Sequence, residues 1–464
     1  MSGIIVGIPP AVLDLVQQGV LERTFHDGLY PKLQFRSEAM AEEWPANTGT
    51  EMFMTRPGLL TPVTEPMVAG VDPTPQTVNH EQWVARLARY SSAIDTHAPT
   101  SVVSNANQFL RNINQLGLQA GMSVNRIARN ELFKAYLSGH TLTTAAVSSG
   151  DLTVPVASLN GFTDVIILGT NTRPETVSPT RPLPIKIGIG SARISRNVVG
   201  FTPTDPTDPY GPGSIVLDVA IPVSGFAART AVVSDYAPRI IRAGGGASID
   251  AITSSDTFVF QLIINAMNYL RSKNVPPHSD GLYHAHIGPL SNSQIYNDQA
   301  WQRLHTACPD HIRYKEGFLG IIGRTMFYEN TEVPDSLNAG ARTATGTNAF
   351  YSRGIGSETT NESGVDIGRI IVTGRGSIYE RYLDEMKYIT EAGVTGKVGE
   401  FSVANNGIQV ALERIRLVLR SPIDRLMDIV SAAWSCSTSF PVPSDISAGG
   451  PERFKRAVVI EHAL

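Results

Sequence analysis

The sequence predicts an α+β fold with an inserted all-β module, and three observations lead to this fold class. Apolar residues recur at steps of three and four over residues 104–138, which is the spacing of one helix face. Short alternating β-type runs, separated by Pro/Gly turns, fill residues 141–247. Helical spacing returns over residues 254–273. A chain of 464 residues is long enough for two or three domains of about 150 residues each.

Charged residues are scarce in this chain. Lys, Arg, Asp and Glu make up 17% of it, against about 25% in ordinary globular proteins. Two interpretations stay open: much of the surface is buried against other subunits, or a β-rich domain carries Thr, Ser and Asn on its outside. The net charge of −4 argues against a protein that binds nucleic acid through a basic face, because such domains usually have a pI above about 9.

The two cysteines, Cys308 and Cys436, are far apart in the sequence, which excludes a CxxC redox motif and a multi-cysteine zinc site. We expect two free buried thiols in a reducing compartment, with a single disulfide as the alternative. No uncharged apolar run reaches about 18 residues, so no membrane-spanning helix is expected. The N-terminal stretch lacks an early basic region and contains Pro9 and Pro10, which is untypical of a signal peptide.

The first hundred residues predict one short helix and a long extended region. Residues 10–23 have the spacing of an amphipathic helix that begins at Pro10. Residues 45–75 are rich in proline and cannot form a central helix or a central strand, so an extended arm or a long hairpin fits better. Residues 76–96 are expected to be partly extended.

The longest predicted element is the helix over residues 104–138, which would run for about 50 Å. Ser104 or Asn105 can cap its start, and Gly139 can adopt the left-handed conformation that ends it. Gly117 and Gly121 each cost this helix about 1 kcal/mol relative to Ala. The helix therefore needs tertiary or quaternary packing. Its apolar face consists of Phe109, Ile113, Leu116, Ala120, Val124, Ile127 and Ala128.

The all-β module and the region after it are predicted from shorter patterns. Strands of the module are expected within 152–159, 164–168, 184–189, 214–223 and 229–233. Ser254 or Ser255 is expected to cap the helix over 254–273, which ends before Pro276. The remaining expectations are a strand at 282–288, a helix at 291–306, strands within 317–334, a loop over 335–366, and strands at 415–420 and 457–462.

The common motifs of enzyme active sites are missing. The sequence contains neither the phosphate loop G-x-x-x-x-G-K-[ST] nor the G-x-S-x-G elbow. The glycine pairs Gly188/Gly190 and Gly374/Gly376 lack the third glycine of a dinucleotide site. We therefore expect no enzyme activity, no cofactor and no catalytic residue.

Histidines cluster between residues 278 and 311. His284 and His286 are two apart on a predicted strand and so point to the same face, where Asp280 or Asp298 would add an oxygen ligand for a metal. We favour the more ordinary interpretation, a strand face packed on polar neighbours, because no third fixed ligand is present. The full set of histidines is His278, His284, His286, His305 and His311.

Three stretches, taken in their order along the chain, carry a resemblance to a known family. Residues 30–62 read YPKLQFRSEAMAEEWPANTGTEMFMTRPGLLTP, residues 270–304 combine a helix end, a Pro-Pro turn, a strand and a helix with D-x-x-W, and residues 316–334 repeat glycine at Gly317, Gly320 and Gly323. They resemble the arm, the extended loop and the later strands of tailed-bacteriophage major capsid proteins with the Hong Kong 97-like fold. The resemblance is weakest over 145–245.

This resemblance implies a division of the chain into six segments. They are an N-terminal arm (1–50), an extended loop (51–97), a spine helix with part of the peripheral domain (98–140), the inserted β domain (141–247), an axial domain (248–375), and peripheral-domain strands with the C-terminus (376–464). We expect the β insertion to stiffen the subunit or contact its neighbours rather than to project outward towards a host surface or a decoration protein.

The resemblance also implies a function, as a subunit that forms hexamers and pentamers of an icosahedral shell around double-stranded DNA in a virion assembled in the host cytoplasm. Scaffolding, portal and cement proteins would be its partners, DNA would be packaged non-specifically, and no membrane is involved. No lysine lies between Lys32 and Lys134. The Lys–Asn crosslink known in the family's namesake therefore cannot form from this loop, and we expect a non-covalent shell.

Arginines at 86, 89, 126 and 129 form a modest basic strip, for which intersubunit salt bridges are favoured over DNA contacts because the chain is nearly neutral. The candidate intersubunit contacts are Arg56, Trp83, Arg86, Arg89, Arg126 and Arg129. Two other functions stay open at this point: an encapsulin-type nanocompartment shell, and a carbohydrate-active or metal-dependent enzyme built on the β domain and the histidines.

Overall fold

The structure is a computed structural model of the chain, and the described residues form two compact units. Unit 1 comprises residues 1–52, 84–129 and 378–441, and unit 2 comprises residues 53–83, 130–377 and 442–464. Each unit is described by itself. The described residues are 20–29, 34–45, 48–57, 60, 62–67, 70, 72–73, 75–78, 80–97, 108–167, 171–222, 225–306, 320–334, 360–385, 396–398, 401–404, 407–412, 414–420, 428–445 and 453–464.

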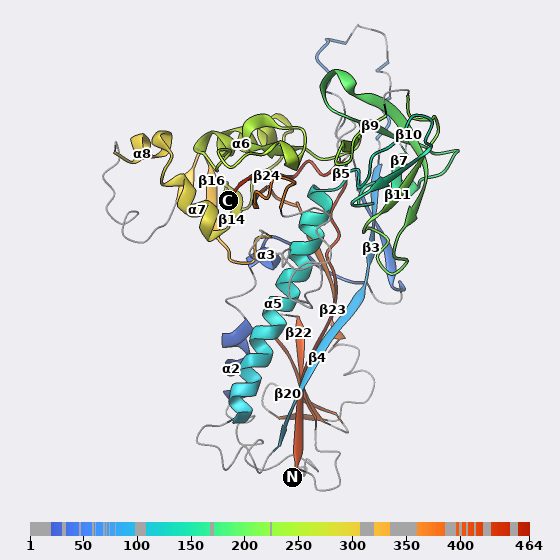
Figure 1. Cartoon of the computed structure of the whole chain (residues 1–464). Helices are drawn as coiled ribbons and strands as arrows, with labels where there is room; N and C mark the ends of the chain where they lie inside the picture. The colour runs from blue at the N-terminus through green and yellow to red at the C-terminus, as the bar shows by residue number, and fades with distance from the viewer. Residues whose placement is uncertain are drawn as a thin grey trace. The chain divides into compact units, whose positions relative to one another are not determined.

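Unit 1 is built on an eight-stranded sheet (Figure 1). Its strands follow the order β1-β18-β23-β22-β21-β20-β19, and β4 pairs with β23 outside this path. The long strand β23 organises the sheet, because β18 and β22 pair with different parts of it and β4 pairs along almost its whole length. The bounds are β1 Met40–Glu43, β4 Ala88–His97, β18 Tyr379–Leu383, β19 Gly396–Val398, β20 Phe401–Ala404, β21 Gly407–Leu412, β22 Ile415–Arg420 and β23 Ile429–Ser439.

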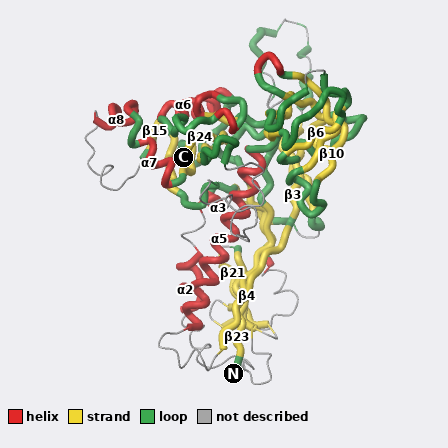
Figure 2. Tube along the Cα trace, viewed as in Figure 1, coloured by secondary structure: helices red, strands yellow, loops and turns green. Residues whose placement is uncertain are grey.

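Three helices accompany this sheet, α2 (Val20–Leu29), α3 (Gln34–Ser37) and the long α5 (Gln108–Tyr136) (Figure 2). With 29 residues, α5 is about 44 Å long. Its part in unit 1, up to Arg129, is bonded to two other segments of that unit. Asn112 Nδ2 donates to Thr96 Oγ1 of β4 at 2.8 Å, and the backbone N–H of Phe35 donates to Asn125 Oδ1 at 2.7 Å. The helix predicted over 104–138 is thus confirmed over its described part.

At Gly117, α5 lies close against the backbone of α2. A Cβ at this position would lie 2.4 Å from the backbone oxygen of Phe25. The Phe25 side chain is itself completely buried. The glycine that weakens the isolated helix is therefore required for the approach of the second helix, which is the tertiary packing that the sequence demanded.

Unit 2 contains a six-stranded sheet in the order β13-β24-β17-β14-β16-β15. Every residue of β17 and β24 is buried, as expected for central strands covered on both faces. The apolar face of α6 packs on this sheet through Leu262, Ala266 and Leu270. The bounds are β13 Ile240–Arg242, β14 Tyr283–Ile287, β15 Ile321–Ile322, β16 Thr325–Glu329, β17 Ile367–Thr373, β24 Ala457–Ala463, α6 Phe260–Ser272, α7 Pro289–Ile295 and α8 Gln299–Thr306.

The predicted all-β module is a closed barrel in unit 2. Its strands pair antiparallel in the order β5-β12-β9-β10-β11-β6, and a bridge between Thr143 and Val156 joins the residues after β5 to β6, which closes the ring. Its interior is filled by Val, Ile, Leu and Phe side chains, including Phe162 and Ile187. The bounds are β5 His140–Leu142, β6 Thr153–Val156, β9 Leu183–Ile187, β10 Ile194–Pro203, β11 Gly213–Leu217 and β12 Ala231–Ser234.

A long hairpin confirms the extended region expected within residues 45–96. Strands β2 (Glu51–Pro57) and β3 (His80–Arg86) are neighbours in a four-stranded sheet of order β2-β3-β8-β7. Contacts of Glu51 with Arg86, Thr55 with Gln82 and Arg56 with Glu81 advance along one strand as they retreat along the other, so the pair is antiparallel. Strands β7 (Asp164–Ile167) and β8 (Asn171–Thr176), from the β module, complete this sheet.

Most predicted elements are confirmed, and the exceptions have physical reasons. Ser254 and Ser255 do not cap α6, which begins only at Phe260; instead the Asp298 carboxylate accepts the backbone N–H of Phe260 at 2.7 Å. The same carboxylate also accepts the N–H of Ala300 at the start of α8, which splits the helix predicted over 291–306 into α7 and α8.

Other predictions fall partly outside the described residues. The short helix predicted over 10–23 is described only from Val20, where α2 begins and continues to Leu29. Of the loop predicted at 335–366, residues 335–359 lie outside the described residues. Residues 360–366 are described and lead into β17, which begins at Ile367. None of the described helices is both long and apolar enough to span a bilayer. The α+β class is confirmed, whereas the six-segment division stays a prediction.

The close approach at Gly117 can be tested by adding one methyl group. Helix propensity alone predicts that Gly117→Ala stabilises the protein by about 1 kcal/mol. The contact with the Phe25 backbone predicts a net loss of about 1–3 kcal/mol instead, because α2 must shift. Urea denaturation measures the difference. Gly200→Ala is the control, since its Cβ would come no closer than 3.9 Å to Val216; a gain in stability for Gly117→Ala would refute this packing.

Candidate functional site

The end of the hairpin near Arg56 and Glu81 is held by a buried cluster of charges in unit 2. Arg56 Nη2 lies 2.9 Å from Glu81 Oε2 and also pairs with the carboxylate of Asp445. Arg456 Nε pairs with Asp445 Oδ2 at 2.9 Å. The Arg56 guanidinium additionally lies over the ring of Trp83, 5.5 Å from its centroid. Two arginines and two carboxylates from β2, β3 and the C-terminal segment thus form one charge-balanced cluster.

Both carboxylates in this cluster are removed from water. Glu81 is fully buried and accepts hydrogen bonds from Ser444 Oγ at 2.6 Å and from the backbone N–H of Asp445. Burial raises the pKa of Asp445, an effect that Arg456 and Arg56 oppose and the charge of Glu81 reinforces. The oxygen atoms of both groups are occupied by these partners, so the cluster is suited to holding segments together rather than to proton transfer or metal binding.

The predicted intersubunit residues differ widely in how much surface they retain. Trp83 is 6% exposed and Arg129 is 1% exposed, while Arg56 is engaged in the buried cluster. Arg86 and Arg89 have side chains that are 71% and 62% exposed, with carboxylate neighbours Glu51 at 2.9 Å and Glu385 at 3.6 Å in the same unit.

A side chain buried in its own chain has no surface to offer to a second copy, so Trp83 and Arg129 are poor candidates for direct contact. Arg126 is half-buried. Arg86 and Arg89 remain the candidates with accessible charge. Their intersubunit role stays a prediction.

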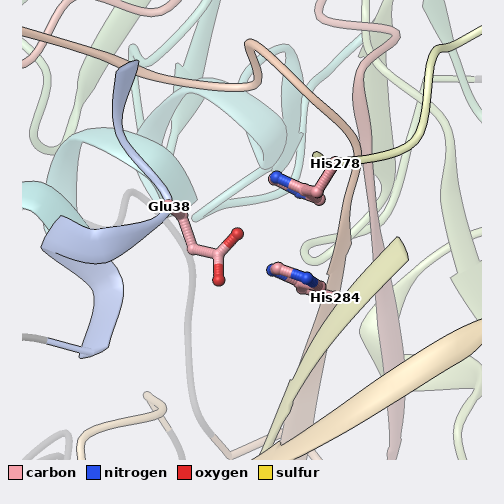
Figure 3. A group of neighbouring side chains, drawn as sticks. All are labelled: Glu38, His278 and His284. Carbon is pink, nitrogen blue, oxygen red and sulfur yellow. The ribbon is translucent and has the colours of Figure 1, made fainter. Parts of the chain in front are cut away.

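His278, which precedes β14, and His284 on β14 lie side by side in unit 2 (Figure 3). His278 and His284 stack with their ring centroids 4.0 Å apart and nearly parallel planes. His284 Nε2 is 2.9 Å from Asp280 Oδ2, and both His284 and His286 lie against the ring of Tyr328, as expected for residues on one strand face.

The carboxylates proposed as oxygen ligands are used differently. Burial acts to raise the pKa of Asp280, but hydrogen bonds from His284 and from the backbone of Leu282 outweigh it and lower the pKa. Asp298 instead binds the N–H groups of two helix starts. Within the described part of unit 2, no three metal-ligating side chains come together, and Glu38, also drawn in Figure 3, belongs to unit 1.

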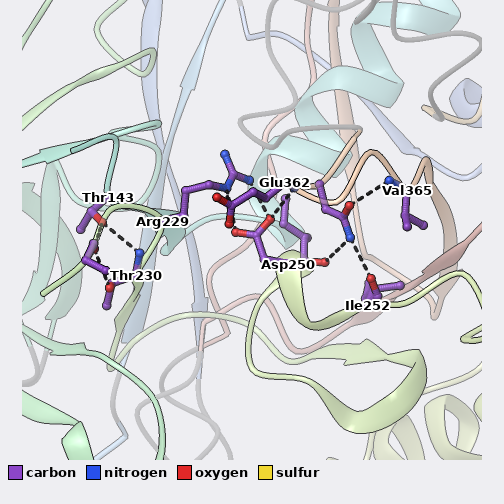
Figure 4. A network of polar contacts seen from close by, with 10 residues as sticks. Thr143, Arg229, Thr230, Asp250, Ile252, Glu362 and Val365 are labelled. Atoms are coloured by element: carbon purple, nitrogen blue, oxygen red, sulfur yellow. Dashed lines mark hydrogen bonds and ion pairs between the residues drawn. The ribbon is translucent and has the colours of Figure 1, made fainter. Parts of the chain in front are cut away.

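A second polar network, which the sequence did not reveal, joins the barrel to the rest of unit 2 (Figure 4). Arg229 lies just before strand β12 of the barrel, and its backbone has a left-handed conformation with φ 61°. Its Nε and Nη2 donate to the two carboxylate oxygens of Asp250 at 2.9 and 2.7 Å. The backbone N–H of Glu362 donates to the same carboxylate. Thr143 Oγ1 accepts the N–H of Thr230, which fixes the loop on the barrel side. No local periodicity signals these pairings, because the partners are distant in sequence.

The central strand β24 carries a third buried charge group. Glu461 accepts Arg242 Nε at 2.8 Å and Arg369 Nε at 3.1 Å. Burial acts to raise the pKa of Glu461, but the two arginines outweigh it and lower the pKa. His462 is buried nearby and His140 is half-buried. Loss of hydration lowers the pKa of each from 6.5 to about 4, so both imidazoles are neutral at pH 7.

The single described cysteine, Cys436, is free and buried in unit 1. Burial raises the pKa of its thiol to about 12, which keeps it protonated and unreactive at neutral pH. The expectation of a free buried thiol is confirmed for Cys436, while Cys308 lies outside the described residues.

No family model matches the chain, and no curated protein matches it significantly. Solved structures that are similar to it include the capsid of Ralstonia phage GP4, with 12% identity and a TM-score of 0.46 over 92% of this chain and 87% of that chain. The capsid asymmetric unit of cyanophage Pam1 has 11% identity and a TM-score of 0.47 over 94% of this chain and 92% of that chain. The acid-stable capsid of Helicobacter pylori bacteriophage KHP30 has 8% identity and a TM-score of 0.47 over 92% and 88%. At these values the likeness carries no functional argument, and function has to be argued from the chain's own residues.

The buried cluster at the hairpin can be tested by neutralising one carboxylate. Glu81→Gln leaves Arg56 with one buried partner fewer and should reduce the free energy of unfolding by about 3–5 kcal/mol. Glu51→Gln, which removes the exposed partner of Arg86, should cost less than about 1 kcal/mol. Urea denaturation of both variants compares the two losses. Equal small losses would show that the cluster does not anchor the hairpin.

The lowered pKa values of His140 and His462 predict that stability falls in acid. Each has a folded-state pKa of about 4 and an unfolded pKa near 6.5, so the unfolded chain takes up the protons first. Stability is therefore full above about pH 6.5 and decreases as pH falls towards 4, by up to roughly 3 kcal/mol for each group. His462→Gln should reduce the slope of the unfolding free energy against pH between pH 6.5 and 4.5, by up to the contribution of about one proton taken up on unfolding. An unchanged slope would contradict this assignment.

Proposed function

We propose that this chain is a structural shell subunit, a major capsid protein that assembles with copies of itself into hexamers and pentamers around double-stranded DNA. The observation that carries the proposal is the connection between β2 and β3. It is fixed where β2 ends and β3 begins by the buried charge cluster, yet its described residues expose large apolar side chains to solvent.

The exposed apolar residues lie close together in the sequence. Phe53 on β2 is 60% exposed, and Leu60, Val63 and Met67 in the connection are 53%, 79% and 71% exposed. Between residues 58 and 79 the only charged residues are Glu65 and Asp72. Exposed large apolar side chains grouped in one segment are candidates for an interaction surface, because contiguous apolar patches on soluble proteins usually mark one.

Proline explains why this segment does not cover itself. Pro62, Pro66, Pro73 and Pro75 remove backbone donors and prevent the connection from extending the β2–β3 ladder. A second copy of the chain would bury the exposed side chains. Many such contacts repeated around a ring and a closed shell give high total stability from individually modest interfaces.

Composition supports a shell rather than a nucleic-acid reader. A net charge of −4 provides no strong basic lining, which would trap DNA that a motor has to pack. We propose that the shell is held non-covalently, since the hairpin region has no lysine. We also propose that scaffolding, portal and cement proteins are its partners and that it is located in the virion. Within the described part of unit 2, His278 and His284 stack on each other, and His284 and His286 pack on Tyr328. The size of the barrel insertion disfavours a nanocompartment.

The proposal can be tested by removing the exposed apolar side chains. The triple variant Leu60→Ser, Val63→Ser and Met67→Ser should stay folded, because these side chains are outside the core, but should lose the rings, sheets or closed shells that the unmodified chain forms in negative-stain electron microscopy. Val219→Ser, which removes an exposed apolar side chain from the barrel, should assemble normally. Unimpaired assembly of the triple variant would refute the role of the hairpin.

A further inference from the structure

Strand β4 forms an outer edge of the sheet in unit 1. It has ten residues and pairs antiparallel with β23 from Ala88, opposite Thr438, to His97, opposite Ile429. Strands β22 and β18 occupy separate stretches of β23 as its other neighbours. Among the described strands, β23 is the only partner of β4.

This edge lacks the usual features that prevent pairing with another chain. Natural edge strands are commonly short, or carry Lys, Pro or a bulge. β4 is long, contains neither Lys nor Pro, and pairs with β23 in one uninterrupted register. Arg89, Ser91, Ala93 and Asp95 are exposed along one face, whereas Thr96 on the opposite face is buried and bonded to Asn112 of α5.

The residues of β4 are arranged so that the strand complements itself. In an antiparallel pair centred on Ser92, Arg89 of one copy lies opposite Asp95 of the other, and Ser91 lies opposite Ala93. The two-fold relation repeats both pairs. Opposite charges directly across two strands stabilise the pairing, and like charges destabilise it. A shift by two residues would leave both charges without this partner, and a shift by one would turn the side chains to the other face.

The present contacts of the two charged residues allow this change of partner. Arg89 Nε is 3.6 Å from Glu385, a carboxylate that also has Arg416 at 3.2 Å and the hydroxyls of Ser435 and Ser437 at 3.0 and 2.6 Å. Glu385 therefore stays satisfied if Arg89 turns away. Asp95 has no ion pair within the described residues.

We infer that β4 is a self-pairing strand, which joins two copies of this chain through an antiparallel contact with its two-fold axis at Ser92. Such a contact would continue the sheet of unit 1 from one subunit into the next, with main-chain hydrogen bonds providing affinity and the Arg89–Asp95 pairs providing register. This inference rests on the proposed self-assembly and adds a specific dyad contact to it.

Cysteine crosslinking tests the register directly. In assembled protein, Ser92→Cys places two thiols opposite each other on the axis and should give a dimer band on a non-reducing gel that a reductant removes. Ala88→Cys is the matched control on the same strand, because its two copies would lie about 27 Å apart along the paired strands. The unmodified chain sets the background from Cys308 and Cys436. Dimer yield from Ser92→Cys no greater than from Ala88→Cys would overturn the inference.

A charge swap tests the chemistry of the same contact. On the Ser92→Cys background, Arg89→Asp or Asp95→Arg alone sets like charges against each other and should reduce dimer yield several-fold. The double variant Arg89→Asp/Asp95→Arg restores opposite charges on both sides of the axis and should recover most of the yield. A double variant that crosslinks no better than the single variants would contradict the pairing.

Sedimentation of the unmodified chain separates this inference from the proposed function. Large oligomers together with absent Ser92→Cys crosslinking would refute the β4 contact and leave shell assembly standing. A chain that remains monomeric would refute both. Circular dichroism of each variant identifies any loss of folding, and the charge variants replace exposed side chains only.

Discussion

The fixed hairpin of unit 2 depends on two carboxylates, Glu81 and Asp445, that are buried together against Arg56 and Arg456. A two-stranded hairpin is marginally stable by itself in water. Here one strand supplies Arg56, the other supplies Glu81, and the C-terminal segment closes the cluster with Asp445 and the hydroxyl of Ser444. Because each buried charge is costly without its partner, the hairpin and the C-terminal segment stabilise each other. Beyond this fixed base, the described apolar residues Leu60, Val63 and Met67 of the connection are exposed.

Both units are completed by segments that are far apart in the sequence. In unit 1, β23 pairs with β4 across more than three hundred residues, and in unit 2 the C-terminal strand β24 lies between β13 and β17. The buried charges follow the same plan, since Glu461 on β24 accepts from Arg242 and Arg369. Non-local pairings of this kind form more slowly than local contacts, because the long loops between the partners must close first.

The elements that could be predicted from the sequence are those with a local repeating pattern of residues. The long helix α5 and the strands of the barrel follow from periodicity. The proline content predicted an extended arm or a long hairpin without deciding between them. The start of α6 was predicted wrongly because Asp298, which accepts the N–H of Phe260, lies in the connection between α7 and α8 and not beside the serines. The candidate residues Trp83 and Arg129 were chosen from residue type, and their burial depends on long-range packing that leaves no local signal. The same reason hid the Arg229–Asp250 pair and the closure of the barrel.

The hairpin connection in unit 2 and the β4 edge in unit 1 are the two surfaces that we propose are completed by other copies of the chain. Sedimentation velocity of the purified chain over a range of concentrations tests this claim most directly. We expect discrete large species that grow at the expense of the 50.0 kDa monomer as concentration rises. A single species with the mass of the monomer at every concentration and salt condition would contradict the account.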